Sequence, residues 1–292
     1  GILNLFLDPL MIFTFGWGIA GAAIATMVSQ MISFGILLAQ CNRKKGCIPI
    51  RRKYFKPTSI RLKEILHAGL PSFGRQALMS VATILLNVCS APYGDAAIAA
   101  MSIVGRIVFL IYSGMLGFGQ GFQPVCGYNF GARKYDRVLD AFYFSLKVAV
   151  TWLTVLGVIA FVFSTPIITV FRRDDPDVIR IGSLALRLAV VTLPVQAWIV
   201  MVNMISQSIG YGYRSSIVSI SKQGTFFIPA ILILPKLTGL LGIQISQPLS
   251  DVLTGILALI VVKPILKALK NGTILPEEPP LGKPVSGNAD TE

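Results

Sequence analysis

Charged residues are scarce in this sequence of 292 residues. They make up 13% of the chain, hydrophobic residues make up 54%, and the mean hydropathy is +0.71. Soluble domains carry about 25% charged residues. The composition therefore excludes an ordinary soluble domain and makes lipid the expected solvent for the apolar surface.

The side chains typical of catalytic and metal sites are also few. The single histidine, His67, excludes a two-histidine metal site, and the four cysteines form no C-x-x-C pair. The sequence has no G-x-x-x-x-G-K-[ST] phosphate loop, which excludes ATP hydrolysis by that route. Nothing in the sequence argues for an enzyme or for a bound cofactor.

Long uncharged runs dominate what is present. A membrane-spanning helix needs about 20 mostly apolar residues, and breaks at Pro, Gly and charge clusters divide the chain into such lengths. They predict a short first helix and seven full spans, at residues 1–15, 19–40, 65–91, 96–124, 138–163, 179–209, 215–235 and 240–266. We therefore expect an all-α integral membrane protein, a polytopic helical bundle.

The net charge of +13 is distributed unevenly among the loops. Loops on one predicted side hold 18 basic residues, nine of them within 41–64, and loops on the other side hold four. Because Lys and Arg stay on the cytoplasmic side, the basic loop and the C-terminus are predicted to be cytoplasmic. No aromatic stacking pattern accompanies the charge, so nucleic-acid binding is not indicated. The Pro- and Glu-rich stretch 269–292 is predicted to be a disordered tail.

The sequence contains a weak internal repeat. At an offset of 221 residues, Gly18-x-x-Gly21 falls on Gly239-x-x-Gly242, and Ser29-Gln30 falls on Ser250-Asp251. This pattern is typical of a transporter built from two homologous halves. The second half has six predicted helices and the first half has its last two, so we expect a fragment that lacks about four helices in front.

Several polar side chains lie at membrane depth, where charge is costly and indicates function. Asp251 is about 17 Å into the last helix, and four cations are candidates for a place at membrane depth: Arg75, Arg106, Lys147 and Arg187. Asp251 either binds a coupling proton or Na⁺, or pairs with one of these cations to hold the bundle together. The excess of cations favours the pairing.

Several motifs resemble those of the MATE multidrug exporters. The stretch 119–132, GQGFQPVCGYNFGA, resembles the motif after the second helix of the C-terminal lobe in that family. Asn4-x-x-x-Asp8-Pro9 is similar to its fifth helix, and 18–30 is similar to its sixth. Gly69-Leu-Pro-Ser72 and Pro194-x-Gln196 resemble the MepA-like branch. The resemblance covers residues 2–268.

This resemblance implies helices 5–12 of a two-lobe, twelve-helix transporter. Residues 1–40 would be the last two helices of the N-terminal lobe, 41–64 the cytoplasmic inter-lobe linker, 65–268 the six-helix C-terminal lobe and 269–292 the tail. The implied activity is H⁺ or Na⁺ antiport of amphipathic drugs and organic cations with alternating access. We expect a multi-pass monomer in the plasma membrane.

The resemblance also suggests site residues. We expect these to face the substrate cavity: Arg75, Gln76, Asn87, Asn203, Gln223 and Asp251. These are expected to form a cytoplasmic turn that shapes the second lobe: Gln123, Pro124, Gly127, Tyr128, Asn129 and Gly131. Other family members bind the coupling cation through acids in helices seven and ten. Here those spans carry Arg75 and Arg187 but no acid inside the membrane, so both H⁺ and Na⁺ stay open.

Three rival functions stay open beside this one. A lipid-linked oligosaccharide flippase of the same superfamily would be favoured by a strongly cationic cavity. The chain could instead be an inactive fragment. A membrane enzyme would require a cluster of His, Asp and Glu at the interface, which the sequence does not contain.

Overall fold

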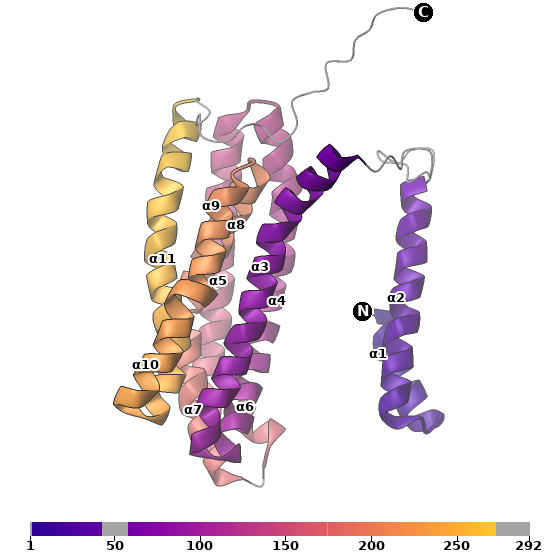
Figure 1. Cartoon of the computed structure of the whole chain (residues 1–292), viewed down its shortest axis with the longest axis vertical. Helices are drawn as coiled ribbons and strands as arrows, with labels where there is room; N and C mark the ends of the chain where they lie inside the picture. Colours follow the sequence, from indigo (N-terminus) through magenta and orange to yellow (C-terminus); the bar gives the residue numbers. More distant parts are fainter. Residues whose placement is uncertain (1, 43–57, 174, 273–292) are drawn as a thin grey trace, which may run out of the picture. The chain divides into compact units, whose positions relative to one another are not determined.

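The computed structural model describes residues 2–42, 58–173 and 175–272, and every regular element within these ranges is a helix (Figure 1). The chain divides into two compact units, Gly1–Leu66 and His67–Glu292. Most of the predicted linker and tail, residues 43–57 and 273–292, lie outside the described residues.

The first unit is a helical hairpin. Helix α1 (Ile2–Pro9) continues as the π-helix η1 (Leu10–Thr14), and a short turn leads into α2 (Gly18–Asn42). Gly18 has a φ of 53°, a left-handed conformation that glycine adopts without strain. A Cβ at Gly21 would lie 2.7 Å from the Met11 carbonyl oxygen, so only glycine lets the two backbones approach this closely.

The second unit is a bundle whose helices follow one another through short turns. Its elements are α3 (Ser59–Ser90, which begins in the first unit), the 3₁₀ turn η3 (Ala91–Tyr93), α4 (Asp95–Gly131), α5 (Tyr135–Val162), α6 (Ser164–Phe171), α7 (Pro176–Val191), α8 (Leu193–Ser208), α9 (Gly212–Ile220), the π-helix η4 (Ser221–Phe227), α10 (Ile228–Thr238) and α11 (Leu240–Lys270).

The number of membrane spans agrees with the sequence. Six helices in the described chain are long and apolar enough to cross a membrane, and the pair α7 and α8, bent by 48°, makes a seventh. These seven coincide with the seven full spans predicted from the apolar runs, which confirms a polytopic helical bundle. The predicted helix 179–209 is this bent pair.

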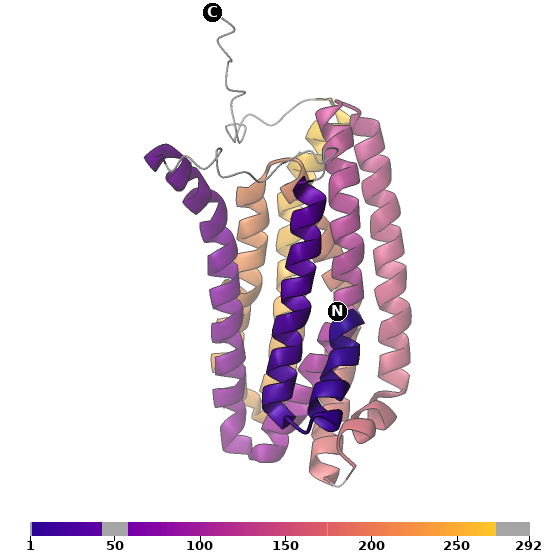
Figure 2. The same cartoon turned by 90° about the vertical axis from the view of Figure 1, so that its right-hand side faces the viewer.

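The bundle core lies where α4, α5, α7, α8 and α11 pack together (Figures 1 and 2). Large side chains such as Phe142, Leu153 and Met201 are fully buried there. Many apolar side chains point outward instead, including Leu110 and Phe144, 74% and 68% exposed. An apolar outer surface of this kind suits lipid rather than water.

Two expectations about loops need correction. The stretch between the predicted spans 138–163 and 179–209 contains the additional helix α6. Asp175 then caps α7: its Oδ1 accepts from the backbone N–H groups of Asp177 and Val178, at 3.2 and 3.3 Å. That carboxylate satisfies two of the donors left open at a helix start.

The second correction concerns the predicted turn at residues 123–131. These residues form the last turns of α4, and the chain reverses only at 132–134. Proline and glycine favour turns in water, but inside a membrane an unpaired backbone group is so costly that the helix continues through them. The Asn129 amide supports this end of the helix by donating to the Val125 carbonyl at 2.8 Å.

Candidate functional site

Two prolines interrupt helices beside the last span. Proline has no N–H and its ring clashes with the preceding turn, which breaks or widens a helix. Pro194 lies in the first turn of α8, directly after the break at Thr192. Pro229 lies in the first turn of α10, directly after the π-helix η4. These local departures from α-helical geometry bring Thr192 and Lys222 toward the same point of α11.

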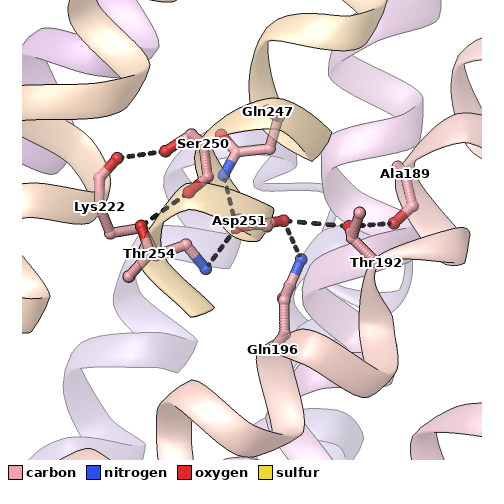
Figure 3. Close-up of polar contacts among 8 residues, drawn as sticks. All are labelled: Ala189, Thr192, Gln196, Lys222, Gln247, Ser250, Asp251 and Thr254. Carbon is pink, nitrogen blue, oxygen red and sulfur yellow. Dashed lines mark hydrogen bonds and ion pairs between the residues drawn. The ribbon is translucent and has the colours of Figure 1, made fainter. Parts of the chain in front are cut away.

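That point is Asp251, which is completely buried (Figure 3). Lys222 Nζ lies 3.0 Å from its Oδ1, and Gln247 Nε2 donates to the same oxygen at 3.3 Å. Its Oδ2 accepts from Gln196 Nε2 at 2.7 Å and from Thr192 Oγ1 at 3.1 Å. The carboxylate thus faces four donors, about as many as its lone pairs can accept. We call these five residues the Asp251 cluster.

The partner of Asp251 differs from the sequence-based expectation. The candidates were Arg75, Arg106, Lys147 and Arg187, whereas the ion pair is formed with Lys222. The predicted span 215–235 contains Lys222, but the count of loop charges assigned this lysine to a cytoplasmic loop, 210–222, so it was not among the candidates. The apolar helix begins at Gly212. The spacing Ser215-x-x-x-Ser219-x-x-Lys222, which places polar groups on one helix face, was the signal that could have revealed it.

The described cations among the four candidates are engaged elsewhere or exposed. Arg187 Nε donates to Ser164 Oγ at 2.7 Å, and its guanidinium lies 5.7 Å from the centre of the Phe161 ring. Arg106 and Lys147 are exposed on the outside of the unit. The side chain of Arg75 lies outside the described residues.

A second polar group, which we call the Asn203 cluster, joins α8, α9 and α4. Ser215 Oγ and Ser219 Oγ donate to Asn203 Oδ1 at 2.9 and 3.2 Å. Gln207 Nε2 donates to Ser215 Oγ at 2.9 Å, and Gln123 Nε2 donates to Gln207 Oε1 at 3.2 Å. Gln123 of the recognised motif is therefore linked to Asn203, one of the predicted cavity residues.

The remaining predicted cavity residues do not join these clusters through described contacts. Gln76 and Asn87 are exposed on α3. Gln223 lies in η4 directly after Lys222, and its buried Oε1 has no hydrogen-bond partner among the described residues. Of the six residues, the structure thus places Asp251 and Asn203 in polar networks that share the α9–η4 segment.

The motif residues after Gln123 lie at the end of α4. Tyr128 is 79% exposed, and Pro124 and Gly131 are exposed as well. A Cβ at Gly127 would lie 3.6 Å from the Ser208 carbonyl oxygen, an ordinary contact distance. The motif therefore forms the end of α4 beside the end of α8, and it contributes Gln123 to the Asn203 cluster.

Sequence comparisons identify relatives of this architecture. The MatE family model matches residues 71–232. The multidrug export protein MepA of Staphylococcus haemolyticus is 28% identical over 264 residues, which cover 89% of this chain and 57% of that protein. MepA of Staphylococcus aureus strain MSSA476 gives the same identity and coverage. The chain thus spans a little over half the length of these relatives.

Solved structures agree with the sequence matches. A MATE transporter in complex with MaL6 superposes with a TM-score of 0.80 at 25% identity, over 92% of this chain and 61% of the other. A MOP superfamily transporter from Pyrococcus furiosus, described as having a binding pocket of reverse polarity that suggests a different function, gives 0.80 at 27% with the same coverage. These matches confirm the resemblance noted in the motifs, including the MepA-like branch. The chain belongs to the MatE family, whose members are transporters rather than enzymes.

Proposed function

We propose that this chain is the larger part of a secondary-active exporter of amphipathic drugs and organic cations. Export would proceed by alternating access and be driven by the inward flow of H⁺ or Na⁺. The observation that carries the proposal is the similarity to multidrug export proteins over 89% of the chain. The Asp251 cluster supports it, because charged groups at membrane depth mark ion and substrate pathways.

The placement of irregular helices also supports transport. Transporters carry their sites at interrupted helices near the middle of the membrane. Here the α7–α8 break at Thr192 and the π-helix η4 both adjoin Asp251 in α11. We place the protein in the plasma membrane with the C-terminal end of α11 on the cytoplasmic side, because the loops on that side hold 18 of the basic residues.

Transport of a fluorescent cation tests this proposal. The native protein, reconstituted into vesicles with ethidium, should move the dye when a pH or Na⁺ gradient is imposed and without ATP. An ionophore that collapses the gradient should stop the movement. Protein-free vesicles treated identically provide the control. Dye movement that persists without any gradient, or that requires ATP, would refute secondary-active export.

The flippase alternative has less support. It requires a strongly cationic cavity, whereas the positive charge of Lys222 is balanced by Asp251 at 3.0 Å. Vesicles containing a lipid-linked oligosaccharide provide the direct comparison. Translocation of that lipid without gradient-driven movement of ethidium would favour the flippase.

A further inference from the structure

We propose that Asp251 is a proton-binding site of the second unit, at which an incoming proton and the ammonium group of Lys222 alternate as partners of the carboxylate. This inference rests on the proposed export function and assigns the proton as the ion that couples to it. The site lies in α11 and η4. It is distinct from the acids of helices seven and ten that the family resemblance suggested for other members.

The groups around Asp251 do not suit a metal cation. Na⁺ requires several oxygen ligands at once. The carboxylate is instead surrounded by hydrogen donors: the Lys222 ammonium, the Thr192 hydroxyl and the amide NH₂ groups of Gln196 and Gln247. A proton can bind to one carboxylate oxygen without displacing the amide donors, because a protonated carboxyl keeps acceptor capacity.

Thr192 lets the site remain hydrogen-bonded in both protonation states. Its hydroxyl oxygen lies 3.1 Å from Asp251 Oδ2 and 3.0 Å from the Ala189 carbonyl oxygen (Figure 3). A hydroxyl has one hydrogen, so it donates to one of these acceptors at a time. With Asp251 ionised, Thr192 can donate to Oδ2. With Asp251 protonated, the carboxyl donates to Thr192 and the hydroxyl donates to Ala189 at the helix break.

Lys222 also has a second favourable contact. Its Nζ lies 5.8 Å from the centre of the Tyr112 ring in α4, and 18% of its side chain is exposed. An ammonium over an aromatic ring is stabilised by the electrons of the ring face. When Asp251 is neutral, Lys222 therefore retains a partner for its charge. Lys222 also lies in the π-helix η4, a geometry that is frequent at functional sites.

The ionisable groups that face this pair are few. Asp251 forms an ion pair with Lys222 of η4. It accepts hydrogen bonds from Thr192 and Gln196 at the α7–α8 break and from Gln247 of its own helix. None of its described polar contacts comes from α5, α9 or α10. Lys222 additionally faces Tyr112.

A polar face leads from Lys222 toward one end of the bundle. Ser215, Ser219 and Lys222 are four and three residues apart, so they follow one side of the α9–η4 segment. The two serines belong to the Asn203 cluster, which extends to Gln207 and to Gln123 near the end of α4. Gln207 is exposed. This row of hydroxyl and amide groups is the route by which we expect the proton to leave Asp251 toward the cytoplasm.

Proton binding changes the charge of the Asp251–Lys222 pair. A hydronium ion transfers its proton to Asp251: one O–H bond of hydronium breaks, one O–H bond forms on the carboxyl group, and a water molecule is left. Lys222 keeps its charge. The pair thereby changes from a net charge of zero to +1. A cationic drug in the same lobe is repelled by the protonated form and tolerated by the ion-paired form. Proton and drug therefore bind alternately, as an antiporter requires.

The test counts protons released when ethidium binds to the native protein in weakly buffered detergent solution. Wild-type protein should release protons, and its Kd for ethidium should rise as the pH falls. Asp251→Asn should release one proton fewer, with a correspondingly weaker pH dependence. Asp177→Asn is the matched control, because that carboxylate forms an exposed pair with Arg180 at 3.2 Å. It should behave as wild type.

An infrared measurement keeps the proposal testable if the Asn variant does not fold. Acidifying wild-type protein should produce the C=O band of a protonated carboxyl, and ethidium should remove it. In Thr192→Val that band should shift, because the carboxyl loses its hydrogen-bond acceptor. The proposal is overturned if wild-type protein exports ethidium along a proton gradient while Asp251→Asn keeps the full proton count. It is also overturned if the Kd follows Na⁺ and not pH. Absence of any gradient-driven export by wild type would instead refute the proposed function.

Discussion

A single buried carboxylate determines much of the chemistry available to the second unit. Removing two charges from water costs several kcal/mol for each ion, and this cost is offset only when geometry and hydrogen bonding are good. Asp251 meets that condition through Lys222 and three uncharged donors. A hydrophobic pair could hold the helices together at least as well. The cluster therefore indicates a selected chemical role more than a stabilising one.

Replacing Lys222 alone should destabilise the protein more than replacing Lys222 and Asp251 together. In Lys222→Met the carboxylate is left buried without its counter-ion, and we expect a loss of about 3 kcal/mol in the free energy of unfolding. The double variant Lys222→Met/Asp251→Asn should recover part of this loss because no unpaired charge remains. Thermal unfolding of the purified native protein measures both. Equal stability of the single and double variants would contradict the coupling.

At the scale of single residues, the sequence predicted Asp251 but not its partner Lys222. The position of Asp251 within a long apolar run marked it as buried, since the helical rise alone gives its depth. Its partner was misassigned because the positive-inside rule counts charges without regard to which acid they meet. Lys222 is tolerated inside the bundle only through a carboxylate on another helix, and such a contact is tertiary information.

At the scale of elements, the two helical turns of the internal repeat share one construction. Gly18 and Gly239 have left-handed φ values of 53° and 65°. Three residues later, a Cβ at Gly21 would press on the Met11 carbonyl oxygen and one at Gly242 would overlap the Leu234 carbonyl. The weak similarity at an offset of 221 residues thus corresponds to the same close approach of consecutive helices, described in each unit separately.

Alanine at Gly242 should therefore be poorly tolerated. The added methyl would overlap the backbone of α10, which cannot move aside as a flexible side chain can, and we expect a loss of about 2–3 kcal/mol or failure to accumulate in the membrane. Gly105→Ala is the matched control, because no atom lies within 4 Å of a Cβ there. It should be neutral or stabilising by up to about 1 kcal/mol.

Membrane expression and thermal unfolding of the two glycine variants provide the measurement. If Gly242→Ala retains the stability of Gly105→Ala, close backbone packing between α10 and α11 is not what the glycine provides. The internal repeat would then reflect turn conformation at Gly239 alone.

The boundaries of the elements were largely predictable, and the interruptions were not. Apolar runs give most span boundaries to within four residues because a crossing requires about 20 mostly apolar residues. The exceptions are α3, which begins six residues before its predicted start at 65, and α4, which ends seven residues after its predicted end at 124. Pro194 and Pro229 were visible, but a proline can bend, widen or end a helix, and packing decides which. The motif at 123–131 was interpreted as a turn for the same reason: its glycines and proline break helices in water and not within a membrane.

At the scale of the whole molecule, the loop charges predict which ends of the helices face the cytoplasm. Ala91, before α4, and Ala132, after it, lie at opposite ends of one span and are both exposed. In protein stripped of its four cysteines, Ala91→Cys should react with a membrane-impermeant maleimide in intact cells. Ala132→Cys should react only after permeabilisation.

Buried Ala149, 1% exposed, supplies the control for this labelling, since Ala149→Cys should remain unmodified in both conditions. Reaction of Ala91→Cys and Ala132→Cys from the same side would mean that α4 does not cross the membrane. If Ala132→Cys reacted in intact cells and Ala91→Cys only after permeabilisation, the orientation would be the reverse of the predicted one. The Asn203 cluster would then lie near the outer face.

The two glycine turns have a consequence for how this chain can change over evolutionary time. Most positions of the two matching segments are free to diverge, because a lipid-facing apolar side chain can be replaced by many others. Gly21 and Gly242 are not, since a neighbouring carbonyl leaves no room for a Cβ. At Gly18 and Gly239 the left-handed φ strains most other residues. Mutational drift therefore leaves the clearest trace of a common origin at these two turns, where few or no side chains fit.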